Sequence, residues 1–210
     1  MEGTRMIRFT RFAAPALVAL SLAFAPHSGF AGEPLTLQEP VAAETLSKSK
    51  QTAPGLYITA ADAGRVLVDH ANVALIDVRT PSEVNLIGYA TAAAANIPSK
   101  FIDPALAFDA KKGNYKMVDN PGFVAEMQAW LASDAGAGVD TLLVMCRSGS
   151  RSAAAIAKLV EAGVDVTLYN VVDGFEGDTN DTGARAVNGW RNAGLPWTYK
   201  IREGLRPGYN

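Results

Sequence analysis

The chain has 210 residues, of which 49% are hydrophobic and 19% are charged, and its formal net charge is −2. Because a weakly acidic chain offers no broad basic surface, we expect no nucleic-acid partner. It contains two histidines and a single cysteine, Cys146, which exclude an internal disulfide and a structural zinc site built from four thiolates or from two cysteines and two histidines. The length fits one domain with an additional segment.

The additional segment lies at the N-terminus. Three arginines precede the uncharged stretch 12–25, and the small residues Gly29 and Ala31 follow at the spacing that signal peptidase requires. We therefore predict that residues 1–31 form a secretory signal peptide. The uncharged stretch is too short to cross a hydrocarbon core of about 30 Å, so a retained anchor is the less favoured alternative. We expect an exported, periplasmic protein without membrane contact after cleavage.

The remaining chain divides into a lead-in, a domain and a tail. Residues 32–55 are polar and show no sustained apolar period, which predicts a disordered lead-in. The folded domain is expected over residues 56–202. Residues 203–210 are expected to form a C-terminal tail.

Helices and strands are expected to alternate within the domain. Apolar spacing predicts helices over 59–70, 121–133 and 153–162, and β-branched apolar runs predict strands over 73–78, 93–97, 141–145 and 166–172. Residues 100–120 are predicted to form a long loop, and Trp190 and Trp197 to belong to a terminal helix and a packing arm. This alternation predicts an α/β domain with a mostly parallel central sheet flanked by helices on both faces.

Cys146 stands at the end of a predicted strand and directly before a predicted helix, which is where open α/β sheets bind ligands. Backbone N–H groups of such a loop and of the first helical turn converge on one point, and this favours an anion there. A thiolate is the reactive form of cysteine. We therefore predict that Cys146 is a catalytic nucleophile. The residues expected to bind its anionic substrate are Arg147, Ser148, Gly149, Ser150 and Arg151.

The stretch 146–152, Cys-Arg-Ser-Gly-Ser-Arg-Ser, resembles the active-site loop of the rhodanese family of sulfurtransferases. Residues 76–83 are similar to the first characteristic block of that family, and Asn96-Ile97-Pro98 resembles the end of its second block. Together with the tail 189–197, the similarity covers roughly residues 57 to 199. Gly88-Tyr89 departs from the family, which commonly has Gly-His there.

The resemblance implies a rhodanese-like fold and a covalent mechanism. Cys146 would take the outer sulfur of a small sulfur-containing anion such as thiosulfate and become a persulfide. Because the sequence has no second cysteine, an external thiol, cyanide or a protein must accept that sulfur. We expect no cofactor beyond this covalent persulfide, and no metal.

Two alternatives stay open. Cysteine-dependent phosphatases and arsenate reductases also place a thiolate in a loop before a helix, but they have five residues between Cys and Arg, whereas Cys146 and Arg151 have four between them. The shorter loop favours a single bound sulfur over phosphate. The other alternative is a non-catalytic, partner-binding rhodanese-like module, which the intact cysteine and arginines disfavour.

Other polar residues receive structural interpretations. Asp77 lies in an apolar run and is expected to be a hydrogen-bonded carboxylate. Two interpretations stay open for Arg79 and Glu83: contact with the substrate path, or a local ion pair that fixes the turn after the first strand, which we favour. The acidic, glycine-rich segment 173–183 is expected to form a loop near the active face, anchored by Arg185.

Overall fold

The computed structural model describes residues 1, 3 and 35–206. Apart from residues 1 and 3, the predicted signal peptide 1–31 and its cleavage point lie outside the described residues, as do residues 207–210 of the predicted tail. Within the described ranges, no helix combines the length and the apolar character needed to cross a membrane.

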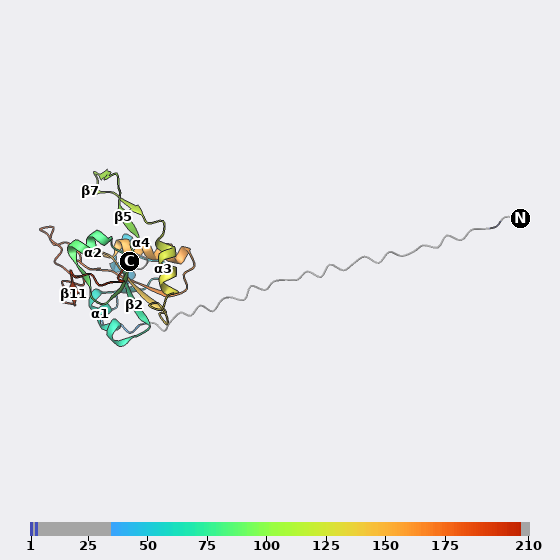
Figure 1. The fold of residues 1–210 in the computed structure, drawn as a ribbon, viewed down its shortest axis with the longest axis horizontal. Coiled ribbons are helices and arrows are strands. Elements are labelled where there is room, and N and C mark those ends of the chain that lie inside the picture. Colours follow the sequence, from blue (N-terminus) through green and yellow to red (C-terminus); the bar gives the residue numbers. More distant parts are fainter. Residues whose placement is uncertain (2, 4–34, 207–210) are drawn as a thin grey trace.

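A five-stranded sheet forms the centre of the domain (Figure 1). Its strands are β1 (Tyr57–Ile58), β2 (Val73–Asp77), β4 (Ala93–Asn96), β9 (Thr141–Met145) and β10 (Thr167–Val171), in the order β1-β10-β9-β2-β4. Every neighbouring pair is parallel. The neighbouring interior strands β2 and β9 are buried along their whole length, which explains why their sequences are apolar runs without alternation.

Helices cover both faces of this sheet. One face packs against α1 (Ala60–Asp69) and α2 (Pro81–Ile87), the other against α3 (Phe123–Leu131) and α4 (Ser150–Glu161). Alternate residues of the strands divide between the two cores: Leu75 and Leu143 join the first, and Ile76 and Val144 the second. The predicted α/β class with a parallel sheet between helices is confirmed, and the architecture is consistent with a rhodanese-like fold.

The helix α2 lies in a stretch for which the sequence analysis predicted no helix. Proline is favourable at the first position of a helix, where its missing N–H has no intrahelical partner. The Thr80 hydroxyl accepts the N–H of Glu83, and the Glu83 carboxylate accepts the N–H of Thr80. This reciprocal capping box starts the helix directly after β2.

Residues 100–120, predicted to be a loop, instead contain two short antiparallel pairs. The strands β5 (Lys100–Ile102) and β8 (Met117–Asp119) form one pair, and β6 (Phe108–Asp109) and β7 (Asn114–Tyr115) form the other. We call residues 100–119 the arm; Figure 1 shows it extending from the body of the domain. Strands of two or three residues leave no readable alternation, so the sequence pattern gave no sign of them.

The lead-in also differs from the prediction of disorder, because its described part, 35–55, lies against the domain. The backbone N–H groups of Gln38 and Glu39 donate to the Asp62 carboxylate, and Leu35 packs against the first core. The Lys50 ammonium lies 2.9 Å from Asp178. Two short 3-10 turns, Ala43–Thr45 and Lys48–Lys50, bend this segment around the domain.

The predicted terminal helix around Trp190 is wrong. Within residues 35–206 the chain forms turns at this point, and the buried Trp190 indole donates to the Pro196 carbonyl at 2.9 Å. The following strand β11 (Trp197–Thr198) pairs with β3 (Tyr89–Ala90) in antiparallel fashion. This C-terminal segment therefore packs beside the end of α2 rather than forming a helix.

A fully buried ion pair joins Asp77 to Arg79. The Arg79 Nη2 lies 2.6 Å from Asp77 Oδ2, and both side chains have 0% exposure. The guanidinium also donates to the Gly88 carbonyl and lies 4.1 Å from the centre of the Phe175 ring. Asp77 is thus the hydrogen-bonded carboxylate that was predicted, whereas the predicted ion pair between Arg79 and Glu83 is wrong.

We expect Asp77→Ala to lower the free energy of unfolding by about 3–5 kcal/mol, because it leaves the buried Arg79 charge without its partner. Urea unfolding followed by circular dichroism measures this loss. The matched control Lys112→Ala removes an exposed cation whose partner is 3.9 Å away, and it should change stability by about 0.5 kcal/mol or less. Equal effects of the two substitutions would contradict the importance of the buried pair.

Candidate active site

Cys146 follows β9 directly, and α4 begins four residues later at Ser150. Gly149 makes this sharp connection with a φ of +96°, and a Cβ there would lie 2.1 Å from the Val172 carbonyl oxygen. Only glycine combines that backbone conformation with so close an approach. As a result the Gly149 N–H donates to the Cys146 Sγ at 3.2 Å.

The segment after β10 supports this loop from the side. The Phe175 N–H donates to the Cys146 carbonyl at 2.8 Å, and the Glu176 N–H donates to the Arg147 carbonyl at 3.0 Å. Gly174 has a φ of +63°, and a Cβ there would lie 2.6 Å from the Cys146 carbonyl oxygen. The sequence predicted that segment 173–183, which contains this glycine, forms a loop near the active face, but it did not predict the contact with the Cys146 loop, which lies far away in the chain.

Buried polar side chains continue from the sulfur into the core. The Ser152 hydroxyl oxygen lies 3.4 Å from the Cys146 Sγ and 2.6 Å from Asn170 Oδ1. The Asn170 amide nitrogen donates to the Gly149 carbonyl at 3.1 Å and to the Lys50 carbonyl at 2.8 Å. A hydrogen-bonded chain thus connects the sulfur to the 35–55 segment. Sequence analysis missed Asn170, which sits inside an otherwise apolar strand and offers only that polarity as a signal.

Both arginines of the loop are paired with glutamates. Arg151 binds both carboxylate oxygens of Glu83, at 2.6 and 2.7 Å. The Arg147 Nε donates to Glu176 at 2.6 Å, while nearly half of the Arg147 side chain stays exposed. Glu83 therefore joins α2 to α4 instead of pairing with Arg79. The roles of Arg147 and Arg151 in binding substrate stay predictions.

The pKa of Glu83 reflects this pairing. Burial alone would raise it, but the hydrogen bonds and positive charge of Arg151, with hydrogen bonds from Thr80, lower it from 4.5 to about 2. Burial alone would lower the pKa of the Arg151 guanidinium, but the hydrogen bonds and the negative charge of Glu83 raise it. Both members of the pair are therefore charged at ordinary pH.

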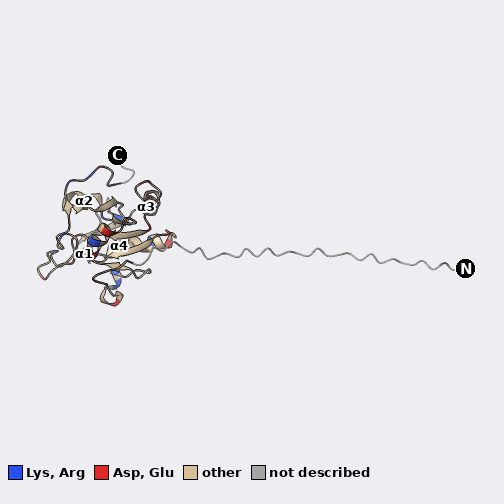
Figure 2. Cartoon of the chain, turned by 90° about the horizontal axis from the view of Figure 1, so that it is seen from below, with Lys and Arg blue, Asp and Glu red and all other residues tan. Residues whose placement is uncertain are grey.

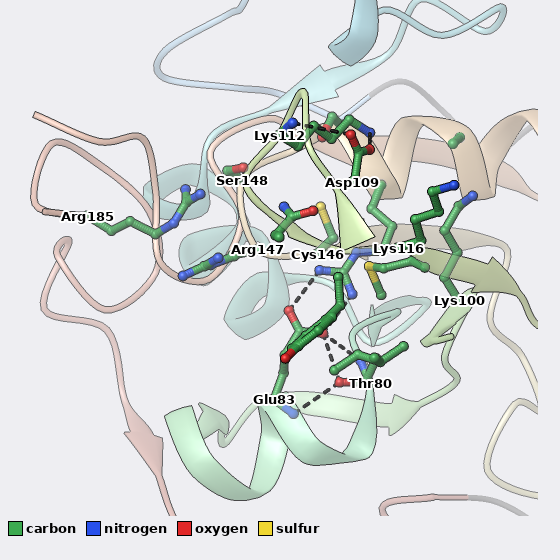
Figure 3. A pocket seen from close by; sticks show the side chains of 17 residues that line it. Thr80, Glu83, Lys100, Asp109, Lys112, Lys116, Cys146, Arg147, Ser148 and Arg185 are labelled. Carbon is green, nitrogen blue, oxygen red and sulfur yellow. Dashed lines mark hydrogen bonds and ion pairs between the residues drawn. The ribbon is translucent and has the colours of Figure 1, made fainter. Parts of the chain in front are cut away.

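A cavity of about 790 Å³ opens over Cys146 (Figure 3). Five of the six site residues predicted from the sequence line this cavity: Cys146, Arg147, Ser148, Ser150 and Arg151. The sixth, Gly149, does not line the cavity but donates its N–H to the sulfur. Residues of α2, the arm and the 173–189 segment complete the wall. Arg185 lines the cavity and hydrogen-bonds the Gly177 carbonyl, so it anchors that segment near the active face as predicted.

Tyr89, at the position where the resembled family commonly has histidine, serves a structural purpose. Its buried hydroxyl accepts the N–H of Arg202 at 3.2 Å and lies 3.3 Å from the Lys200 carbonyl. This ring is absent from the cavity wall and instead holds the C-terminal segment in place. Among the described residues, no group of three or more His, Cys, Asp or Glu side chains is placed to hold a metal ion.

Comparisons with known proteins show several similar chains. No family model matches. An uncharacterized protein of Rickettsia prowazekii (strain Madrid E) is 29% identical over 143 residues, which make up 68% of this chain and 96% of the relative. The crystal structure of Rv0390 from M. tuberculosis is 29% identical with a TM-score of 0.49, and covers 68% of this chain and 96% of its own.

Two more distant structures are each 19% identical, with TM-scores of 0.37. A rhodanese-related protein from Thermoplasma volcanium covers 69% of this chain and 99% of its own. A protein of unknown function from Rhodopseudomonas palustris CGA009, described as a possible tyrosine phosphatase, covers 79% and 98%. A functional assignment for this chain must therefore depend on the residues of its site.

Replacing Glu83 tests the ion pair. A group whose pKa is lower in the folded state stabilises the fold above its unfolded pKa, and this contribution disappears as the pH falls. Glu83→Gln should therefore be less stable than the wild type by up to about 3 kcal/mol at pH 7, with the difference shrinking as pH falls from about 4.5 towards 2. Urea unfolding at several pH values measures it. The exposed Glu203→Gln is the control, and a pH-independent difference for Glu83→Gln would contradict the pairing.

Replacing Gly149 tests the loop geometry. Gly149→Ala places a Cβ against the Val172 carbonyl and imposes a φ that alanine avoids, so the loop must shift. We expect alkylation of Cys146 by iodoacetamide at pH 7 to slow at least about ten-fold, because the N–H bond to the sulfur is lost. Gly163→Ala, at a glycine of positive φ with open space around it, is the control for backbone strain alone. Equal rates in both variants would contradict the assigned role of Gly149.

Proposed function

We propose that the protein is an exported sulfurtransferase, which moves sulfane sulfur from a donor such as thiosulfate to an external acceptor through a Cys146 persulfide. One observation carries this proposal. The Cys146 Sγ lies at the base of an open cavity, accepts the Gly149 N–H at 3.2 Å, and stands where α4 begins. Backbone N–H groups at the start of a helix attract negative charge, so this position suits the anionic outer sulfur of a persulfide.

The first half of the reaction loads the cysteine. The Cys146 thiolate attacks the outer sulfur of thiosulfate and forms a new S–S bond. The original S–S bond breaks, and sulfite leaves with its electron pair. The product is an anionic outer sulfur beside the loop. Cationic side chains around the cavity reduce the repulsion between an anionic nucleophile and an anionic donor.

The second half of the reaction returns the sulfur to an outside nucleophile. Cys146 is the only cysteine in the sequence, so no internal thiol can resolve the persulfide. An external thiol, cyanide or a thiol-bearing protein attacks the outer sulfur, and the Cys146 thiolate is regenerated. No cofactor is required for this exchange.

The contacts of Arg151 favour sulfur transfer over phosphatase chemistry. A phosphatase loop needs a guanidinium that is free to bind two phosphate oxygens. Here both carboxylate oxygens of Glu83 already occupy Arg151, and only four residues separate it from Cys146. The buried polar chain from Cys146 to Asn170 likewise favours a chemically active site over a module that only binds a partner.

Mass spectrometry of the intact protein tests the proposal. Incubation with thiosulfate should add one sulfur atom to the folded wild type, and cyanide should remove it. Cys146→Ser should show no adduct. A folded wild-type protein that never gains the sulfur would refute sulfur transfer, and Cys146-dependent turnover of an aryl phosphate would establish the phosphatase alternative instead.

A further inference from the structure

Positive charge surrounds the cavity from three parts of the chain: the arm, the Cys146 loop and the 173–189 segment. The cations on its wall are Lys100, Lys112, Lys116, Arg147, Arg151 and Arg185, and its only acidic lining residues are Glu83 and Asp109. Basic and acidic residues are otherwise interspersed over the described part of the chain (Figure 2). The excess of cations is thus a local property of the cavity in a chain of net charge −2.

Most of these cations already have an acidic partner. The pairs are Arg151–Glu83, Arg147–Glu176, Lys100–Asp119 and Lys112–Asp109. Lys116 forms no ion pair or side-chain hydrogen bond within residues 35–206, and Arg185 is held there by a backbone carbonyl rather than a carboxylate. These two charges, on opposite sides of Cys146 in Figure 3, remain available to an anionic ligand.

Arg185 and Arg147 point towards the same side of the cavity (Figure 3). Burial and the positive charge of Arg147 lower the pKa of Arg185, although Glu176 and Asp178 oppose this effect. Two like charges that share one space repel each other, and an anion between them relieves the repulsion. This arrangement provides a second binding position for an anion, in addition to the position beside the Cys146 sulfur.

The size of the cavity exceeds the needs of a small inorganic donor. Its volume of about 790 Å³ falls in the range of pockets that take organic ligands, about 300–1,000 Å³. The arm supplies the additional wall, including Tyr115 and Met117 with their apolar surface. A ligand that fills this space needs an organic framework as well as negative charge.

We propose that the arm and Arg185 form a binding subsite for the sulfur acceptor, and that this acceptor is an organic thiol carrying two or more carboxylates. The inference rests on the proposed sulfurtransferase function. Lys116 and Arg185 bind the carboxylates, and the thiol faces Cys146.

The transfer balances without any further reactant. The acceptor thiolate forms a bond to the outer sulfur of the Cys146 persulfide, and the bond from that sulfur to Sγ breaks. The electron pair stays on Sγ, so the acceptor leaves as its persulfide and Cys146 returns as thiolate. The acceptor brings its carboxylates, in addition to its thiolate, towards an anionic persulfide, and unpaired cations that bind those carboxylates accelerate its approach.

The test begins with wild-type protein loaded by thiosulfate and verified as persulfide by intact mass. The loss of that sulfur is then timed with mercaptosuccinate, which has two carboxylates, and with 2-mercaptoethanol, which has none. Lys116→Gln should slow the reaction with mercaptosuccinate about five-fold and leave the reaction with 2-mercaptoethanol unchanged. The two thiols differ in intrinsic nucleophilicity, so the comparison is the ratio of variant to wild type for each thiol.

Lys111→Gln is the matched control, because Lys111 is an exposed lysine of the arm that does not line the cavity. It should change neither rate. Arg185→Gln should repeat the selective loss. Equal slowing with both thiols, no slowing with either, or the same loss in Lys111→Gln would overturn the subsite. A wild-type protein that never forms the persulfide would instead refute the proposed function.

Discussion

The candidate site depends on one backbone constraint, the tight connection from β9 to α4. Cys146 ends a fully buried strand, and α4 starts only four residues later. The chain makes this connection because Gly149 adopts a positive φ against the Val172 carbonyl and Gly174 lets a second segment approach from the side. The N–H of Gly149 then faces the sulfur. The surroundings of the Cys146 sulfur thus depend on backbone packing as much as on the cysteine itself.

Glu83 connects this loop to the rest of the domain. It caps α2 through Thr80 and binds Arg151 of α4 with both carboxylate oxygens. A single carboxylate therefore fixes the relative position of two helices that lie on opposite faces of the sheet. The buried pair between Asp77 and Arg79 stabilises the preceding turn, so that α2 presents Glu83 to the site.

The arm and the 35–55 segment add what the central domain lacks. The arm forms one wall of the cavity with its lysines and apolar surface. This wall extends the cavity beyond the size that a small anion needs. The 35–55 segment contacts the buried polar side chains next to the sulfur, because the Lys50 carbonyl accepts a hydrogen bond from the Asn170 amide. Both segments lack a strong pattern in the sequence, yet both contribute to the surroundings of Cys146.

Within residues 35–206, the sequence by itself determined the α/β class, four of the five strands of the central sheet, three of the four α-helices and the loop that follows Cys146. These features follow from local rules: apolar periodicity, helix capping and the close spacing of small and basic residues. The tertiary structure alone decided which charges pair, as with Glu83 and Arg151, and which distant segments reach the sulfur, as with Asn170 and the arm. Such contacts join residues far apart in the chain and arise only when helices and strands pack, so no local pattern encodes them.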